Sequence, residues 1–404
     1  MPFYKYRPLK QFGRHNARIF KDTYRRRLLT AEPQLEIPPS LLERGVVIED
    51  PNEWFKSPPK PAVSPTKPAV EGLSCRVFDG QEPFSAGIAQ ALNLLNAVRR
   101  PGPSPSLTSR TAGLNTDLEQ TLRWSILQSQ QMDSAKDRLP KQFNPEQPHM
   151  IYTRSFGISP RRRNSLLLKH LLTMSTNLAA AKNVRRALAA RHVISWEGLC
   201  GHLTLADGQR VLLPIEPELS VLGHSPLPPL ASQAEIAATE LEPLEDIHPI
   251  APAIDLVPNQ VPPEQFSAAP PYPLAHSPVP LYLHTVLINK PWDYAYPWTD
   301  EETTAHLVVC TGAAALALAR KLGQQTLARP LVVHGVQVSR ANVDLVSFQL
   351  NSLDFCGQVK NIAWIQGGLK LFHQGPNFWD SYVEVEQLQP EVFRNIAALI
   401  TDHA

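Results

Sequence analysis

The chain has 404 residues, 43% of them hydrophobic, and a net charge of +2, which fits a globular protein with room for two or three domains. Forty prolines against nineteen glycines indicate long irregular stretches, because proline fixes its own backbone and cannot donate a backbone hydrogen bond. Four widely spaced cysteines without a CxxC pair argue against a disulfide framework or a zinc site. The sequence has no uncharged apolar run of about 18 residues, the length of a membrane-spanning helix.

Residues 1–30 form a basic arm with nine lysines or arginines and one acid, Asp22. A basic, acid-poor N-terminus with interleaved apolar residues is typical of a mitochondrial targeting segment. The same composition suits an arm that lies along nucleic-acid phosphates. The sequence leaves both interpretations open, and the triplet Arg25, Arg26 and Arg27 is a candidate RNA contact under the second.

Residues 31–70 follow as an extended, proline-rich tether, and residues 71–245 as a mainly helical basic region that contains a hairpin. Apolar spacing predicts helices over residues 84–98, 115–132 and 166–191. Asp207-Gly208 predicts the turn of a hairpin over residues 193–213. Ser232 and Glu235 have the spacing of a capping box that opens another helix.

The basic character of this region is concentrated in residues 147–196, which contain nine lysines or arginines and no acid. Arg161, Arg162 and Arg163 precede the predicted helix over residues 166–191, where cations oppose the helix dipole. Further along that helix, Lys182, Arg185 and Arg186 share one face. The sequence therefore predicts that both groups contact RNA.

Residues 246–298 contain twelve prolines from Pro249 to Pro297, too many for packed helices or central strands, so we expect an irregular segment laid over a partner. Residues 299–404 regain order. Thr299 and Glu302 predict a capped helix ending near Gly323, and apolar runs at 331–338, 345–350, 361–366 and 369–373 predict antiparallel strands. A strand over residues 382–386 and a helix from Pro390 to His403 complete the prediction.

The predicted fold class is therefore α+β, with helices packed on a small, mostly antiparallel sheet and long proline-rich irregular extensions. Within it, Val346, Phe348, Leu350 and Trp364 are expected to supply one buried apolar face. Polar side chains on the same strands are expected to bind the backbone of a partner protein. These side chains are Gln349, Asn351, Lys360 and Asn361.

Known catalytic motifs are absent from the sequence, and no cofactor or metal site is predicted. Two cysteine–histidine pairs have spacings that could place a nucleophile near a base: Cys310 with His306, and Cys200 with His202. Cys310 lies in the most apolar helix of the chain, so a core thiol is the favoured interpretation. The carboxylates form no pair suited to acid–base catalysis.

Several short segments occur in an order that resembles a known family. They are His248–Leu256, Pro270–Pro273, Leu281–Leu283, Thr311–Arg320, Pro330–Val333, Phe348–Asp354 and Val359–Trp364. In this order they resemble the thirty-seven family of animal mitochondrial large-ribosomal-subunit proteins, more closely than its relative, the sixty-five family. The resemblance covers residues 247–400 most clearly, whereas residues 100–190 depart from it.

This resemblance implies a structural constituent of the mitochondrial large ribosomal subunit, located in the matrix. Its partners would be ribosomal RNA, neighbouring ribosomal proteins and the paired sixty-five relative, with no membrane span and no small-molecule substrate. Two alternatives stay open. One is a mitochondrial RNA-binding factor outside the ribosome, and the other is an enzyme that uses a cysteine or histidine.

Overall fold

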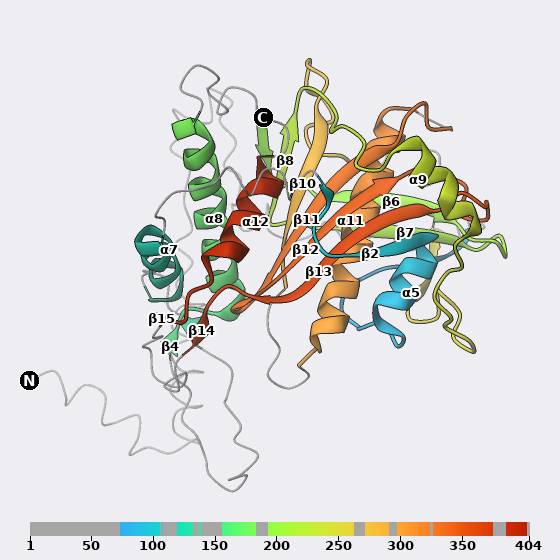
Figure 1. Cartoon of the computed structure of the whole chain (residues 1–404). Coiled ribbons are helices and arrows are strands. Elements are labelled where there is room, and N and C mark those ends of the chain that lie inside the picture. The colour runs from blue at the N-terminus through green and yellow to red at the C-terminus, as the bar shows by residue number, and fades with distance from the viewer. Residues whose placement is uncertain are drawn as a thin grey trace, which may run out of the picture. The chain divides into compact units, whose positions relative to one another are not determined.

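The computed structural model describes residues 73–105, 107, 119–131, 137–138, 156–182, 193–261, 271–290, 297–323, 326–374 and 385–401. These residues all belong to one compact unit that spans residues 70–404. Two sheets and the helices packed against them form this unit, which confirms the predicted α+β class (Figure 1).

The larger sheet has seven strands and forms the centre of the unit. In spatial order they are β2 (Ala97–Pro101), β13 (Asn361–Lys370), β12 (Asn342–Leu350), β11 (Leu331–Ser339), β10 (Tyr282–Asn289), β8 (Leu219–Gly223) and β5 (Val193–Ser195). Strands β11, β12 and β13 are antiparallel neighbours, as the sequence predicts. Parallel pairing occurs at β2–β13 and β10–β11, so the sheet is mixed but mostly antiparallel.

The smaller sheet has four strands, and two short strand pairs lie apart from both sheets. The four strands, in spatial order, are β6 (Leu199–Thr204), β7 (Arg210–Ile215), β1 (Leu73–Val77) and β9 (Val257–Val261). Strands β6 and β7 form the predicted hairpin, and Gly208 at its turn has a φ of +78°. The short pairs are β3 (Asp137–Arg138) with β4 (Phe156–Gly157), and β14 (His373–Gln374) with β15 (Val385–Glu386).

Helix α11 (Asp300–Lys321) lies between the two sheets and is buried along almost its whole length. It contacts β10 to β13 of the larger sheet and β6 and β7 of the smaller one. Glycines allow this close approach, because a Cβ on Gly201 of β6 would lie 2.8 Å from Ala313, and one on Gly335 of β11 would lie 2.1 Å from Thr311. The capping box of Thr299 and Glu302 begins the helix as predicted.

In the described part of the chain, α11 is the one helix long and apolar enough to cross a membrane. Its most apolar window of 18 residues has a mean hydropathy of 1.3, and 94% of that window is buried inside the protein. Enclosure by two sheets accounts for this composition, because a helix that is covered on all sides can be apolar on all sides.

Helices α7 (Glu119–Gln131), α8 (Pro160–Lys182) and α12 (Pro390–Ile400) cover the opposite face of the larger sheet (Figure 1). Their buried residues share one apolar cluster with residues of β8, β10, β11 and β12. Two smaller helices lie elsewhere. Helix α5 (Gly87–Leu94) packs against α11, while α9 (Gln233–Ala238), followed by η3 (Thr239–Leu241), lies near the β2–β13 edge.

The helix predicted over residues 84–98 is shorter than its apolar spacing indicates. Helix α5 ends at Leu94, Asn96 adopts a positive φ of 43°, and the chain then enters β2. Val98 therefore pairs with Ile362 of β13. Pairing with a distant strand outweighs the local helical pattern here, which a periodicity argument cannot detect.

The prediction that residues 249–297 exclude central strands is wrong. Strand β10 lies within this range, is mostly buried and has paired neighbours on both sides. Pro280 and Pro291 flank the strand, and no proline lies inside it. The number of prolines in a segment is therefore a poor guide to whether it contains a strand. Here the prolines are spaced so that the eight residues of β10 can all pair.

The apolar runs at 361–366 and 369–373, predicted as separate strands, are not separated at Gly367 and Gly368, since β13 continues through both glycines. The register with β12 shifts by one residue between Val343 and Leu345, and Gly368 has a φ of +67°. A glycine with positive φ at such a shift is typical of a β-bulge, which bends a strand without ending it.

Candidate functional site

The basic triplet Arg161, Arg162 and Arg163 lies in the first turn of α8, which begins at Pro160 rather than at the predicted Leu166. Arg161 and Arg162 are exposed, and Arg163 is partly buried. The first turn holds no acid. Three cations therefore lie at the helix end that favours anions, as the sequence predicts.

Strand β10 anchors this turn through its last residue. Asn289 donates from Nδ2 to the backbone oxygen of Arg161 over 2.8 Å and to a carboxylate oxygen of Glu218 over 3.3 Å. Asn164 donates to the backbone oxygens of Lys290 and Val338, which ties the following residue of the helix to the same end of the sheet. The triplet is thus held on a fixed backbone.

Glu218 lies beside this turn, and its partners come mainly from α8. It accepts a 2.5 Å hydrogen bond from Ser165 and lies 3.6 Å from the ammonium group of Lys169. Burial raises the pKa of Glu218, but the hydrogen bonds from Ser165 and Asn289 and the charge of Lys169 together hold it below its ordinary value. Glu218 is therefore an ionised carboxylate whose charge is offset by Lys169 and whose oxygens accept hydrogen bonds from Ser165 and Asn289.

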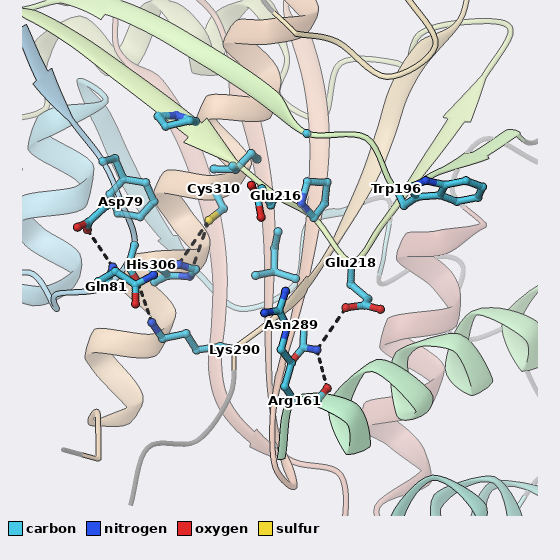
Figure 2. Close-up of a pocket in the computed structure, with 17 residues that line it drawn as sticks. Asp79, Gln81, Arg161, Trp196, Glu216, Glu218, Asn289, Lys290, His306 and Cys310 are labelled. Carbon is cyan, nitrogen blue, oxygen red and sulfur yellow. Dashed lines mark hydrogen bonds between the residues drawn. The ribbon is translucent and has the colours of Figure 1, made fainter. Parts of the chain in front are cut away.

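A cavity of about 860 Å³ opens beside this turn (Figure 2). Its wall is formed by residues of the β1–α5 connection, the β5–β6 loop, the β7–β8 connection, the end of β10, α8 and α11. Arg161, Trp196 and Glu216 line it together with Asn289 and Lys290. The cavity therefore joins the predicted basic turn to residues that the sequence alone did not bring together.

Two of those residues, Trp196 and Glu216, are not predicted from the sequence. The side chain of Trp196 is 77% exposed, in the loop between β5 and β6, and Figure 2 shows it at the edge of the group of lining residues. Glu216 is also exposed, directly after β7. A tryptophan between two short strands, next to the polar residues Ser195 and Glu197, is the one signal that could have indicated an exposed aromatic.

Lys290 lines the cavity but is bound within the protein. Its ammonium group donates to the backbone oxygen of Gly80 over 2.9 Å and lies 3.3 Å from the centre of the Trp298 ring. In Figure 2, Lys290 points toward the β1–α5 connection and away from Arg161. Lys290 is thus a structural cation rather than a free one.

His306 and Cys310 form the inner wall of the cavity and belong to the core. His306 donates from Nδ1 to the side-chain oxygen of Gln337 over 2.7 Å, and its ring lies 3.7 Å from the Cys310 sulfur. Burial, with a smaller effect of Lys290, lowers the pKa of His306 to about 3. Burial raises the pKa of Cys310 to about 12. At neutral pH the thiol stays protonated and the imidazole stays neutral, which is the opposite of an activated pair.

The second cysteine–histidine pair is equally unsuited to nucleophilic catalysis. His202 accepts a short hydrogen bond from Arg320, and burial together with that arginine lowers its pKa to about 4. Burial raises the pKa of Cys200 to about 11. The cysteines at positions 75, 200, 310 and 356 are all free thiols, and only Cys356 is exposed. The described residues contain no cluster of three or more His, Cys, Asp or Glu able to hold a metal ion.

Asp344 is a buried carboxylate on the face of β12 that meets α11. It accepts hydrogen bonds from Thr304 over 3.0 Å and from the backbone nitrogen of Gly368 over 2.8 Å. Burial raises its pKa to about 6, despite these hydrogen bonds. Both partners stabilise the bulge of β13 against the start of α11, so Asp344 has a structural place rather than a catalytic one.

The amide and lysine side chains predicted to bind a partner are used within the protein, and that prediction is wrong. Gln349 accepts from the backbone nitrogens of Leu230 and Ala231, and Asn361 accepts from those of Asn351 and Ser352. Lys360 donates to three backbone oxygens, those of Thr239, Glu240 and Gln358.

The prediction that the apolar residues of these strands share a single apolar face is also wrong in one respect. Trp364 lies on the opposite side of the sheet from Val346, Phe348 and Leu350, in a separate cluster with Val98 and Ile236. The register explains this, because Ala363 pairs with Phe348, and successive side chains of a strand point to opposite faces.

The remaining predicted RNA contacts fall outside the described residues. Arg25, Arg26 and Arg27 precede them, as does the whole arm over residues 1–30, and Arg185 and Arg186 lie in the interval 183–192. Lys182 is the last residue of α8, but its side chain is not described. Of the nine candidate residues, the structure therefore locates the side chains of Arg161, Arg162 and Arg163.

In sequence, the chain is similar to proteins of the large ribosomal subunit. No family model matches the sequence. The relatives are named large ribosomal subunit protein mL37. The chain is 30% identical to the protein of Rattus norvegicus over 221 residues, covering 50% of each chain. It is 29% identical to that of Gallus gallus over 266 residues, covering 60% of this chain and 58% of the relative.

A third relative, mL37 of Bos taurus, is 30% identical over 193 residues, covering 43% of each chain. The matched part of the chain thus spans about half the length of these relatives. The predicted resemblance to the thirty-seven family is confirmed by these similarities.

Proposed function

We propose that this protein is a structural constituent of the large ribosomal subunit of mitochondria, where it contacts ribosomal RNA and neighbouring ribosomal proteins. The similarity to the mL37 proteins is the observation that carries this proposal. The composition of the basic arm, nine cations against one acid, supports a mitochondrial location. The sixty-five relative is the protein partner that the resemblance suggests.

The RNA contact in this proposal is the first turn of α8. Arg161 and Arg162 are exposed, and Glu218, whose oxygens bind Ser165 and Asn289 beside this turn, is paired with Lys169. Cations at a helix N-terminus destabilise the helix unless an anion compensates their charge. Phosphate groups of RNA supply that anion. Lys182, Arg185, Arg186 and Arg25 to Arg27 remain proposed contacts on sequence grounds.

The proposed role is non-enzymatic. A catalytic cysteine needs a thiolate, whereas burial raises the pKa of Cys310 and lowers that of its neighbour His306. A non-ribosomal RNA-binding factor is the second candidate, because the exposed arginines of α8 would serve it equally well. The two candidates differ in whether the protein is a stoichiometric part of the subunit.

Sedimentation of a mitochondrial lysate through a sucrose gradient separates these candidates. We expect the tagged chain to migrate with the large subunit through a high-salt wash, because a constituent is held by protein as well as by phosphate contacts. Migration at the top of the gradient, with RNA still bound at low salt, would favour the non-ribosomal factor.

The RNA contact is tested in the same gradient with Arg161, Arg162 and Arg163 each changed to Glu. We expect this variant to leave the subunit at a lower salt concentration than the wild type, since phosphate contacts are lost. A control variant carries Glu at Arg99, Arg329 and Lys370, three exposed positions outside α8, and has the same net charge. Equal release of both variants would contradict a specific role of the triplet.

The location is tested by deleting residues 1–30. We expect the tagged truncated chain to stay in the cytosol. Normal import of the truncated chain would contradict the assignment of a targeting function to the arm.

A further inference from the structure

Strand β2 leaves one edge of the larger sheet open, because it stands last in the spatial order of the described strands, next to β13. Just before β2 begins, the backbone nitrogen of Asn361 donates to the oxygen of Asn96 over 2.9 Å. Just after β2 ends, the backbone nitrogen of Gly102 donates to the oxygen of Ile365 over 3.2 Å. The residues of a parallel strand alternate in the side to which they direct their N–H and C=O. Even-numbered residues of β2 therefore face β13, and Arg99 directs both groups outward.

The outward groups of β2 are available to a further strand. Arg99 and Pro101 are both exposed. Among the described residues, none forms a hydrogen bond with the backbone N–H or C=O of Arg99. Pro101 points the same way but offers only its C=O, because proline lacks the N–H. Unpaired backbone groups at a sheet edge are a template on which an extended segment of another chain can pair.

An acidic segment lies beside this edge. The chain between residues 211 and 289 contains nine acids and no lysine or arginine. Glu242 in this segment forms a bidentate ion pair with Arg100 of β2, with N–O distances of 2.7 and 2.5 Å. The backbone oxygen of Glu245 accepts from Nδ2 of Asn93, in the helix that precedes β2, over 2.8 Å. Residues 242–245 are thus held next to β2 by contacts at both ends.

The charge of this segment is only partly offset within the protein. Arg100 offsets Glu242. Glu240, Glu245 and Asp246 are exposed, and none of them forms an ion pair with a described residue. Leu241, between Glu240 and Glu242, is 91% exposed. The surface beside β2 therefore presents carboxylates next to an apolar side chain.

This combination selects among the possible occupants of the edge. The phosphates of RNA are repelled by the carboxylates. A second copy would bring its own Arg99 and its own acidic segment to the pair, and like charges across paired strands are destabilising. Lysine and arginine fit, because their charged ends pair with carboxylates while their aliphatic stems cover apolar surface such as that of Leu241. The chemistry therefore favours an extended basic segment of a different protein.

We infer that β2 binds an extended, basic segment of a partner protein, which adds to the larger sheet as a further strand. Backbone hydrogen bonds to Arg99 give this segment its register, and lysines or arginines on one of its faces meet the exposed acids of residues 240–246. The side chains of Lys360 and Asn361 play no part, since both are used within the protein. The inference goes beyond the proposed function and does not depend on it.

The test is fluorescence anisotropy of the full-length protein with two labelled heptapeptides that have blocked ends. One is Lys-Val-Lys-Val-Lys-Val-Lys, and the other has Glu in place of each Lys. We expect the wild type to bind the lysine peptide about tenfold more tightly than the glutamate peptide, a difference of roughly 1.4 kcal/mol. Equal affinities for the two peptides would overturn the inference.

The variant Arg99→Pro tests the strand pairing. It lacks the outward N–H, so its affinity for the lysine peptide should fall by about tenfold. Arg99→Ala is the matched control, because it also lacks the guanidinium but keeps the N–H. The two variants should unfold at nearly the same temperature, since the lost N–H lies outside the ladder with β13. Equal affinities of the two variants, or unfolding of Arg99→Pro alone, would overturn the inference.

A triple variant tests the charge, with the substitutions Glu240→Gln, Glu245→Gln and Asp246→Asn. It should lose the preference for the lysine peptide. A control variant neutralises three exposed carboxylates elsewhere and should keep the preference, with the substitutions Glu82→Gln, Glu119→Gln and Asp207→Asn. Loss of the preference in both variants, or in neither, would show that the acidic segment beside β2 does not select the peptide, and would overturn the inference.

Two further measurements address the other possible occupants. A labelled uridine 20-mer should bind Arg99→Pro and Arg99→Ala equally, and a loss confined to Arg99→Pro would place RNA at the edge and overturn the inference. Sedimentation equilibrium should give the same mass for both variants. A dimer that only Arg99→Pro dissociates would place a second copy at the edge, with the same consequence.

The sucrose gradient separates this inference from the proposed function. A chain that migrates with the large subunit, while both Arg99 variants bind the lysine peptide equally, retains the proposed function and loses the edge site. A chain that stays at the top of the gradient, while Arg99→Pro alone loses the peptide, retains the edge site and loses the ribosomal role.

Discussion

The corner of the larger sheet near β13 and the rim of the cavity beside α8 use polar residues in opposite ways. At the corner, the amides of Gln349 and Asn361 each accept hydrogen bonds from two backbone nitrogens of neighbouring segments. At the rim, Arg161 and Trp196 project from segments that are anchored through their backbone and through other side chains. A polar side chain is therefore free for a partner where something else already fixes its segment.

Replacement of Trp364 by Ala should give the largest loss at the corner. The ring is 9% exposed and packs with Val98, Ala231, Ile236 and Ile362. Removing a buried aromatic side chain costs about 3–5 kcal/mol, so the free energy of unfolding should fall by this amount in urea denaturation. A loss below about 1 kcal/mol, the size typical of a surface change, would mean that this cluster does not hold the corner together.

Replacement of Asn361 by Ala should give the next largest loss. Its side chain is buried, accepts from the backbone nitrogens of Asn351 and Ser352, and donates to the backbone oxygen of Leu95 over 2.9 Å. Leaving such groups without partners should lower the free energy of unfolding by about 2–3 kcal/mol. Asn395→Ala on α12 serves as a control for the loss of an asparagine. Equal stability of the two variants would show that the Asn361 network is not needed.

The free energy of unfolding should depend on pH through the buried titratable residues in and around α11. The folded-state pKa of His306 is lowered to about 3 and that of His202 to about 4, so their contributions are complete above pH 6.5 and are lost as the pH falls. Asp344 acts in the opposite direction. Its folded-state pKa is raised to about 6, so the carboxyl binds a proton in the folded state first and adds stability as the pH falls from about 6 to 4.

The variant Asp344→Asn removes that opposing contribution. The melting temperature of this variant should therefore fall more steeply between pH 6 and pH 4 than that of the wild type, whatever its value at neutral pH. Parallel curves for the two proteins would show that Asp344 does not titrate in this interval.

Replacement of Arg161 by Ala should have the smallest effect on stability. Its side chain is exposed and its backbone oxygen, which Asn289 binds, is retained in the variant. A change within about 0.5 kcal/mol is expected for such a surface position. RNA affinity should nevertheless fall. A marked loss of stability would show that the arginine serves the fold, and that the rim does not differ from the corner.

The sequence predicts the local elements of this fold better than their pairing. The capping boxes at Ser232 and Thr299, the turn at Gly208 and the three strands from β11 to β13 depend on neighbouring residues and are confirmed. The place of Val98 in β2 depends on Ile362, far away in the chain. No local pattern contains that information.

The candidate site shows the same limit. The unfavourable position of Arg161 at a helix N-terminus is visible in the sequence, because it follows from charge and from one helix boundary. Trp196 and Glu216 join it only through the packing of the β5–β6 loop on the end of β7. The internal use of Gln349 was equally hidden, since the backbone nitrogens that it binds belong to residues 230 and 231.

The burial of α11 between two sheets has a consequence for how the chain reaches its native state. The strands that enclose this helix come from both sides of it in the sequence, since β6, β7 and β10 precede it and β11, β12 and β13 follow it. While the chain emerges during synthesis, α11 lacks the second half of its cover and presents an apolar surface to any membrane or unfolded chain nearby. We therefore expect that completion of β13 at residue 370, and not formation of α11 itself, ends the dependence of this chain on chaperones.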